Sequence, residues 1–131
     1  MTVPKIVKME VYPVAGYDSM LMNLSGAHGP YFTRNLVILT TDTGLTGVGE
    51  IPGGKTITDT LNDTKEFVVG STIGDYKKVL KQIQTKYGYR DAGGRGAQSF
   101  DLRTTILVVT AVESAFLDIL GKYLHVPVAA L

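Results

Sequence analysis

The chain has 131 residues, enough for one domain with a buried core but few enough that it need not be a complete enzyme. Hydrophobic residues make up 44% and charged residues 19%, which excludes intrinsic disorder, and the absence of cysteine excludes disulfides, thiolate zinc sites and cysteine nucleophiles. The net charge of +1 provides no basic field for nucleic acid or an anionic membrane, so we expect neither as a partner.

The N-terminal residues, MTVPKIVKME, contain neither the apolar stretch nor the cleavage site of a secretory signal. No apolar run in the sequence approaches the ~20 residues that a membrane span requires. We therefore expect a soluble, cytoplasmic protein.

The first third of the sequence predicts a three-stranded antiparallel meander. Residues 5–14 alternate between apolar and polar side chains, as in a half-buried strand, and Pro13 marks either an edge position or the end of that strand. Residues 35–42 form a continuous apolar strand, and the turn DTGL leads into a third strand at 45–51. The irregular stretch between the first two strands, 18–35, is far longer than a turn requires, and loops of such length are usually functional or disordered.

Three helices are predicted after the strands. Residues 56–69 have weakly periodic apolar positions and several threonines, which lower helix propensity. Residues 72–87 follow helical spacing with lysines on the wet face, and Gly88 can cap that helix. A second irregular loop, 89–103, precedes a last helix at 104–124. The predicted class is therefore α+β, a three-stranded antiparallel meander followed by a bundle of about three helices.

The last predicted helix is apolar around most of its circumference. Its polar residues recur every four positions as one thin stripe: Thr110, Ser114, Asp118 and Lys122. The sheet and the other helices can cover one side of such a helix, so we expect part of its surface to need a partner. The sequence then stops at VPVAAL without a polar ending, and we expect residues 1–131 to be one domain of a longer protein.

His28, in the first irregular loop, is the first candidate for chemistry, with Asn23 close by in the sequence. Spacing alone leaves two interpretations: a solvated loop histidine, or a hydrogen-bonding group for a polar ligand whose charge can change near neutral pH. The other histidine, His125, stands at a helix end, where the helix dipole is enough to explain it. We assign His125 no function.

The second irregular loop contains the glycine-rich stretch DAGGRGAQS, which lacks the strand and helix that flank phosphate-binding motifs. A glycine-hinged connector with ion pairs is the simplest interpretation, and contact of Ser99 or an arginine with a ligand is the alternative. No Asp, Glu and His cluster has metal-ligand spacing, and no nucleophile and base pair is visible. The residues alone predict two loops suited to hold a polar ligand and no machinery for transforming one.

Several stretches in order resemble a known family. Three strands followed by helices are similar to the N-terminal capping domain of the enolase superfamily. Within that superfamily, the segments PVAGYDSMLMNLSGAH, FTRN, TGVGEIPGG, RDAGGRG and FDLRTT resemble the D-glucarate dehydratases over most of residues 13–131. The resemblance implies that residues 1–131 are the capping domain and that the TIM barrel with the catalytic site is absent from this chain.

The resemblance also implies a reaction. In the barrel of these enzymes a lysine and a histidine act as bases, while Asp, Glu and Asn residues hold Mg²⁺. The metal stabilises the enediolate formed when the proton α to a carboxylate is removed, and β-elimination of water then gives 5-dehydro-4-deoxy-D-glucarate. No catalytic residue and no metal ligand is therefore expected in this chain, and the fragment alone is expected to be inactive.

Carried over by position, the resemblance assigns substrate contacts to His28 and Asn23 in the first loop and to Ser99 and Phe100 in the second. Ser99 replaces the family's threonine and keeps its hydroxyl. Tyr17 stands where some members have histidine, which leaves room for a paralogue acting on another acid sugar. The expected partners are D-glucarate or a related aldarate, the C-terminal barrel domain and further copies in a homo-oligomer. A free-standing binding module is the alternative.

Overall fold

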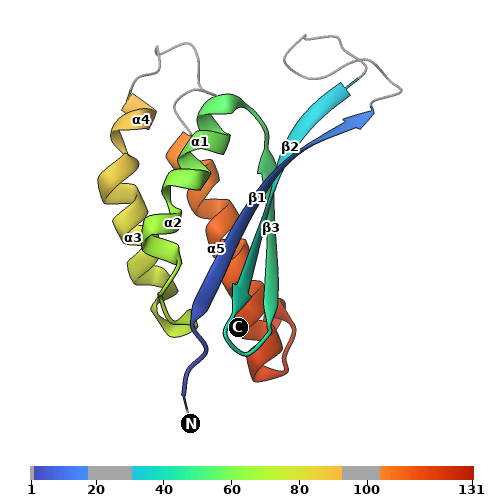
Figure 1. Ribbon diagram of the computed structural model, residues 1–131, viewed down its shortest axis with the longest axis vertical. Helices are drawn as coiled ribbons and strands as arrows, with labels where there is room; N and C mark the ends of the chain where they lie inside the picture. Colours follow the sequence, from blue (N-terminus) through green and yellow to red (C-terminus); the bar gives the residue numbers. More distant parts are fainter. Residues whose placement is uncertain (1, 18–30, 93–103) are drawn as a thin grey trace.

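The computed structural model of the protein describes residues 2–17, 31–92 and 104–131. Three antiparallel strands form one sheet in the order β1 (Ile6–Tyr17), β2 (Tyr31–Thr41) and β3 (Thr46–Pro52). The helices gather on one face of this sheet (Figure 1). They are α1 (Lys55–Asp63), α2 (Lys65–Val68), α3 (Tyr76–Tyr87), α4 (Tyr89–Ala92) and α5 (Thr104–Leu124), with 3₁₀ turns η1 (Ile73–Asp75) and η3 (Val128–Ala130). The predicted α+β class and the meander are confirmed.

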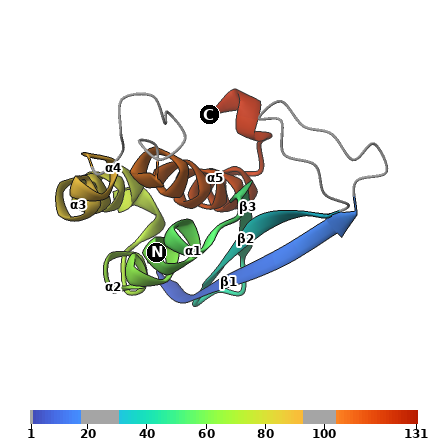
Figure 2. The ribbon, with the colours of Figure 1, turned by 90° about the horizontal axis from the view of Figure 1, so that it is seen from above.

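Helix α5 is the centre of the helical layer. It packs both on β3 and on α3 (Figure 2). The residues that face these neighbours are fully buried: Val108, Val112, Phe116 and Ile119. Among the described residues Ile106 stays 59% exposed on the opposite side of α5. The structure thus covers one side of the helix, as the sequence predicts.

Glycines in β3 let α5 approach the sheet very closely. A Cβ atom at Gly49 would lie 2.1 Å from the Ala111 carbonyl oxygen, and one at Gly47 would lie 2.1 Å from the Ala115 carbonyl oxygen. Both distances are far below van der Waals contact, so no other residue fits there without moving the helix. Small residues on both partners therefore set the distance between helix and sheet.

The polar stripe of α5 closes the open edge of β3. Val48 N–H donates to Asp118 Oδ2 at 3.0 Å, and Lys122 Nζ donates to the Thr46 carbonyl at 2.6 Å. An unpaired strand edge is a template for association with other chains. Asp118 and Lys122 of the polar stripe therefore provide hydrogen-bond partners for the backbone of a strand that is distant in sequence.

Strands β1 and β2 are longer than the sequence indicates. Their pairing continues past Val14 and Arg34 through the partners Ala15 with Thr33, Gly16 with Phe32 and Tyr17 with Tyr31. Residues 31–35 of the predicted irregular stretch thus belong to β2, and Pro13 lies inside the edge strand instead of ending it. The alternating pattern fails here because Ala15, Phe32 and Thr33 are all exposed, so no buried face imposes it.

The predicted helix at 56–69 is divided into α1 and α2 at Thr64. The Thr64 hydroxyl donates to the Leu61 carbonyl at 2.6 Å, a local bond that competes with the helical pattern. The predicted cap at Gly88 is confirmed, since Gly88 is the C-cap of α3, but its φ of −59° is right-handed and the chain continues into α4. Helix α4 occupies the start of what was predicted as an irregular loop. The bounds of α5 are confirmed.

Helix α5 also has the length and composition of a membrane-crossing helix, with 21 residues and a mean hydropathy of 1.6 in its most apolar stretch. The expectation that no apolar run approaches a membrane span is therefore wrong on length and composition. Half of that stretch is buried inside the fold, and the core helix of a globular domain meets the same criteria.

Candidate functional site

Three connections lie at one end of the molecule, which we call the loop end. Strand β1 ends there at Tyr17 and β2 begins there at Tyr31, β3 passes there into α1, and α4 ends there opposite the start of α5 (Figure 1). The alternating up and down course of the elements causes this, since every second connection falls at the same end. The described backbone therefore places the borders of both loops that the sequence predicts to hold a ligand at the same end, with the strand tips and α4 on opposite sides of it (Figure 2).

The four predicted substrate-binding residues lie outside the described residues. His28 and Asn23 fall within 18–30, and Ser99 and Phe100 fall within 93–103. Their assignment stays a prediction. The structure does describe the residues that flank each of these two segments.

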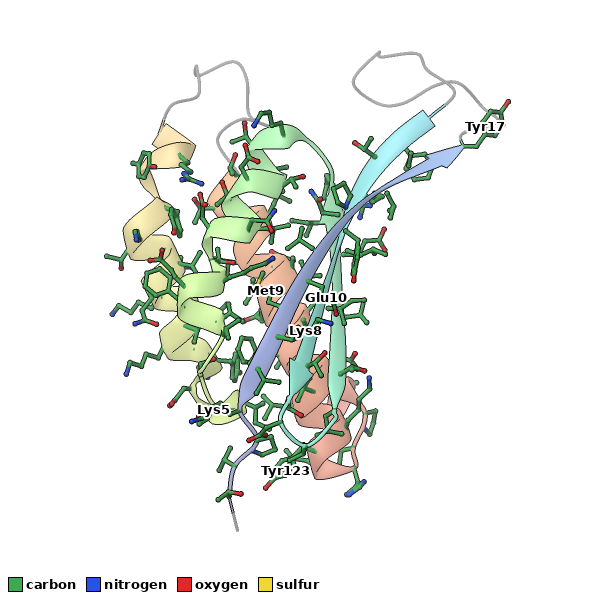
Figure 3. All side chains as sticks on the ribbon, viewed as in Figure 1. Lys5, Lys8, Met9, Glu10, Tyr17 and Tyr123 are labelled. Carbon is green, nitrogen blue, oxygen red and sulfur yellow. The ribbon has the colours of Figure 1, made fainter. Side chains whose placement is uncertain are left out.

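Residues 15–17 and 31–33 flank the segment 18–30 and pair as a two-stranded ribbon. Phe32 lies over Gly16 so closely that a Cβ at Gly16 would come within 2.3 Å of the Phe32 ring. Tyr17, 67% exposed, stands at the tip of β1 and away from the helices (Figure 3). The ribbon carries the ends of this segment beyond the body of the sheet.

A buried asparagine fixes the corner where β3 passes into α1. Asn35 is fully buried in β2, its Nδ2 donates to the Pro52 carbonyl at 3.3 Å, and its Oδ1 accepts from the Thr58 hydroxyl at 3.0 Å. Gly54 adopts a φ of +124°, which only glycine tolerates well. The corner is thus held by side-chain bonds to β2 and by a glycine-specific turn.

A cluster of side chains around Tyr87 lies next to the residues that flank the segment 93–103. The Tyr87 hydroxyl donates to the Asp63 carbonyl of α1 at 3.1 Å, and burial raises its pKa, which keeps it protonated as a donor. The Tyr87 carbonyl accepts from the Thr105 hydroxyl of α5 at 2.9 Å. One residue therefore joins α1, α3 and α5 where the chain leaves α3.

Arg90 completes this cluster. Its guanidinium lies 4.6 Å from the centre of the Tyr87 ring, and it donates to the Thr60 hydroxyl at 2.6 Å and to Asp63 Oδ2 at 2.9 Å. Bonds to Tyr89 and Asp63 raise the pKa of Arg90, so it is always charged. We call Tyr87, Arg90 and Thr105 the anchor. Sequence reasoning placed Tyr87 on the buried face of its helix but missed Arg90, which the spacing of three residues from Tyr87 could have indicated.

The anchor borders a polar hollow of about 650 Å³ lined by α1 and α4. Asp59, Asp63 and Arg90 line it, but Asp59 pairs with Lys55 and Asp63 with Arg90. Within the described ranges no group of three or more His, Cys, Asp or Glu side chains is placed to hold a metal. The described residues therefore do not fit a magnesium site, and what they offer is support for the two predicted loops.

Comparison with known proteins identifies the class of fold. No known family profile matches the chain. The structure superposes on an enolase from Pseudomonas fluorescens Pf0-1, solved with magnesium, potassium and tartrate, with a TM-score of 0.86 and 24% identity over 99% of this chain and 32% of that one. An enolase from Thermobispora bispora DSM 43833, solved with magnesium and formate, gives a TM-score of 0.79 and 28% identity over 96% and 31%. The fold is that of the N-terminal capping domain of enolase-superfamily proteins.

A curated relative points to a particular activity. The chain is 34% identical to a probable glucarate dehydratase of Streptomyces coelicolor A3(2), over 96% of its own length and 31% of that protein. The chain thus spans about a third of the length of the proteins it matches. The activity and substrate of the whole matched proteins are therefore only proposed for this chain, below.

Proposed function

We propose that the chain is the capping region of a larger enolase-superfamily dehydratase that acts on D-glucarate or a closely related aldarate. The observation that carries the proposal is the 34% identity to a probable glucarate dehydratase across 96% of the chain. The position of three connections at the loop end supports it, because a capping domain presents its loops from one end. We further propose a homo-oligomer located in the cytoplasm.

In this proposal the chain binds and orients the substrate, and the bases lie in a barrel domain elsewhere in the protein. His28, Asn23 and Ser99 offer hydrogen bonds to the hydroxyls and the distal carboxylate, and Phe100 helps to exclude water. Mg²⁺, which the Thermobispora bispora structure contains, supplies charge stabilisation next to the carboxylate when it is bound by the rest of the protein. The loops then close over the substrate while the barrel moves the proton.

The decisive experiment compares the 131-residue chain with the whole natural gene product. Both are incubated with D-glucarate and Mg²⁺, and formation of 5-dehydro-4-deoxy-D-glucarate is measured by mass spectrometry. We expect turnover by the whole product and none by the chain alone. Turnover by the isolated chain contradicts the capping role.

The reading frame beyond Leu131 separates this proposal from a free-standing binding module. A continuation with a Lys-x-Lys motif agrees with a barrel enzyme, whereas a stop codon at that point favours the module. The preferred aldarate is decided by assaying the whole product in parallel on D-glucarate, idarate and galactarate. A clear preference for galactarate would indicate a related dehydratase with altered specificity.

A further inference from the structure

An apolar hollow of about 350 Å³ lies between α2 and α3, two elements that pack side by side in the helical layer (Figure 1). Phe67 of α2 lines one side, and the remaining lining comes from five residues of α3: Lys78, Lys81, Gln82, Thr85 and Lys86. The lining is almost entirely apolar, although most of these residues are polar at their ends. The lysines therefore line the hollow with their hydrocarbon stems and hold their ammonium groups at its rim.

The aromatic ring in this hollow is held in place by its neighbours. Phe67 meets the ring of Tyr87 edge-on, with 6.3 Å between the ring centres, and Lys86 Nζ lies 5.6 Å from the centre of the Phe67 ring. Phe67 itself remains half-buried. A partner that covers the rest of this ring gains about 25 cal/mol for each Å² of apolar surface it removes from water.

Helix α3 concentrates positive charge around the hollow. It contains four lysines and no acidic residue: Lys77, Lys78, Lys81 and Lys86. The whole chain has a net charge of only +1, so the remaining residues are net negative and the lysines of α3 form a local basic face. Lys86 pairs with Glu66, whereas Lys78 and Lys81 have no carboxylate partner within the part of the chain that the structure describes.

The stability of α3 does not explain where these lysines stand. Lys77 and Lys78 lie in its first turn, where the helix dipole disfavours positive charge. Lys78 and Lys81 are three positions apart, a spacing at which like charges on a helix repel each other. Carboxylates of a partner would offset both effects. The charge of this face therefore fits an acidic partner.

We propose that the apolar hollow is a docking site for an acidic peptide segment of another protein. One large apolar side chain of the segment enters the hollow against Phe67, and carboxylates on either side of it pair with Lys78 and Lys81. The volume lies at the lower end of ligand pockets, roughly 300–1,000 Å³, which suits one side chain better than a whole cofactor. A hollow between two helices admits a side chain but not the flat surface of a bilayer. This docking role goes beyond the proposed function and does not depend on it.

The first test measures binding of a defined probe to the whole natural gene product. The probe is a blocked, fluorescein-labelled pentapeptide with one phenylalanine between two pairs of glutamates, and fluorescence anisotropy gives its Kd. We expect saturable binding that weakens as salt screens the lysines. Replacing the phenylalanine of the probe by alanine should raise Kd roughly tenfold, because the buried apolar side chain is lost. Equal binding of the two peptides, or no binding of the probe at millimolar concentration, overturns the proposal.

Two lysine variants separate the hollow from the general charge of α3. Lys78→Glu changes a residue that lines the hollow, whereas Lys77→Glu changes an exposed neighbour that is absent from the lining. Both variants alter the net charge of the protein equally. Lys78→Glu should raise Kd of the probe roughly fivefold and Lys77→Glu less than about twofold, because only the first places a carboxylate next to the bound acidic segment. Equal increases would show attraction at long range only and overturn the proposal.

A third variant fills the hollow and leaves the core unchanged. Thr85 is exposed on α3, so Thr85→Phe adds a ring to the hollow without removing a buried side chain. It should raise Kd of the probe roughly tenfold, whereas Thr85→Ala leaves the hollow open and should bind as the natural protein does. Thermal melting followed by circular dichroism confirms that both variants are folded. Unchanged binding by folded Thr85→Phe overturns the proposal, and if that variant does not fold, the two lysine variants decide.

Other occupants of the hollow give different results. Cosedimentation with phosphatidylglycerol vesicles that is stronger than binding of the probe and is lost in Lys78→Glu would assign this face to a membrane. Self-association that is lost in the same variant, measured by analytical ultracentrifugation, would assign it to a second copy of the protein. Either result overturns the peptide partner. None of these measurements uses aldarate turnover, so they test this proposal separately from the proposed function.

Discussion

The body of the sheet and the ribbon formed by residues 15–17 and 31–33 are built by different forces. In the body, β2 buries Asn35, Val37 and Leu39 towards the helices. Gly47 and Gly49 lie so close to the backbone of α5 that neither position has room for a Cβ atom. In the ribbon, Tyr17 and Phe32 are 67% and 49% exposed, and the two strands are joined by the backbone pairing of residues 15–17 with 31–33. Packing therefore determines the body, whereas the ribbon can change its side chains at little cost.

The largest expected difference between the two regions comes from adding one methyl group. Gly49→Ala places a Cβ against the Ala111 carbonyl, part of a helix backbone that cannot turn aside, and should destabilise the protein by about 3 kcal/mol. Gly16→Ala meets only the half-exposed Phe32 ring, which can rotate into solvent, and should cost less than about 1 kcal/mol. Urea-induced unfolding followed by circular dichroism measures both, and equal losses would show that the ribbon is packed as tightly as the body.

The same contrast explains how far the sequence determines the fold. The bounds of α5 were predictable because 104–124 keeps a helical period and contains no proline. The first strand was predictable in the body because one buried face forces its side chains to alternate, and the second was predictable because its apolar run is continuous. The ribbon was missed because it has no buried face, and the break at Thr64 was missed because a threonine hydroxyl can bond its own helix or point elsewhere.

The candidate site was predictable only in part. His28, Asn23, Ser99 and Phe100 were assigned by resemblance, and the described residues do not test them. That both loops start from one end of the molecule was not evident from residue patterns, since it depends on how α3, α4 and α5 are packed. The spacing from Tyr87 could have indicated Arg90, but not its partners Thr60 and Asp63, which lie about thirty positions earlier in the chain.

Asn35 marks the boundary between the body and the ribbon, and its removal should have the second largest effect. Asn35→Ala removes a fully buried side chain together with its bonds to the Pro52 carbonyl and the Thr58 hydroxyl and should cost about 2 kcal/mol. Thr58→Ala removes only the partner that is nearer to solvent and should cost about 1 kcal/mol or less. Hydrogen exchange at Gly53 reports the effect locally, and equal protection in both variants would mean that Asn35 does not hold the corner.

His125 is a position of local backbone strain next to the well-packed body. It ends α5 with a φ of +58°, while its N–H binds the Lys122 carbonyl and Val126 N–H binds the Gly121 carbonyl, the bonding of a Schellman cap. His125→Gly should stabilise the protein by roughly 0.5–1 kcal/mol, since glycine adopts this conformation without steric cost. His125→Ala keeps the unfavourable φ and should give no gain. A higher urea midpoint for the alanine variant would contradict the backbone explanation.

The smallest expected effect is electrostatic and lies on the outer face of β1. The Tyr12 hydroxyl donates to Glu10, and this bond, with Lys8 nearby, lowers the pKa of the Glu10 carboxyl below its usual value. A carboxyl whose pKa is lowered by folding adds stability above its unfolded pKa and loses that stability as the pH falls through its folded pKa.

Tyr12→Phe should therefore return the pKa of Glu10 towards the ordinary range and weaken the acid dependence of unfolding by a small amount. NMR titration of the Glu10 carboxyl carbon measures the shift directly, and Lys8→Met separates the charge of Lys8 from the hydrogen bond of Tyr12. If Lys8→Met moves the pKa more than Tyr12→Phe, charge and not the hydrogen bond controls Glu10. Because both groups face solvent, the effect is confined to the outer surface of the strand and leaves the contact between the sheet and α5 unchanged.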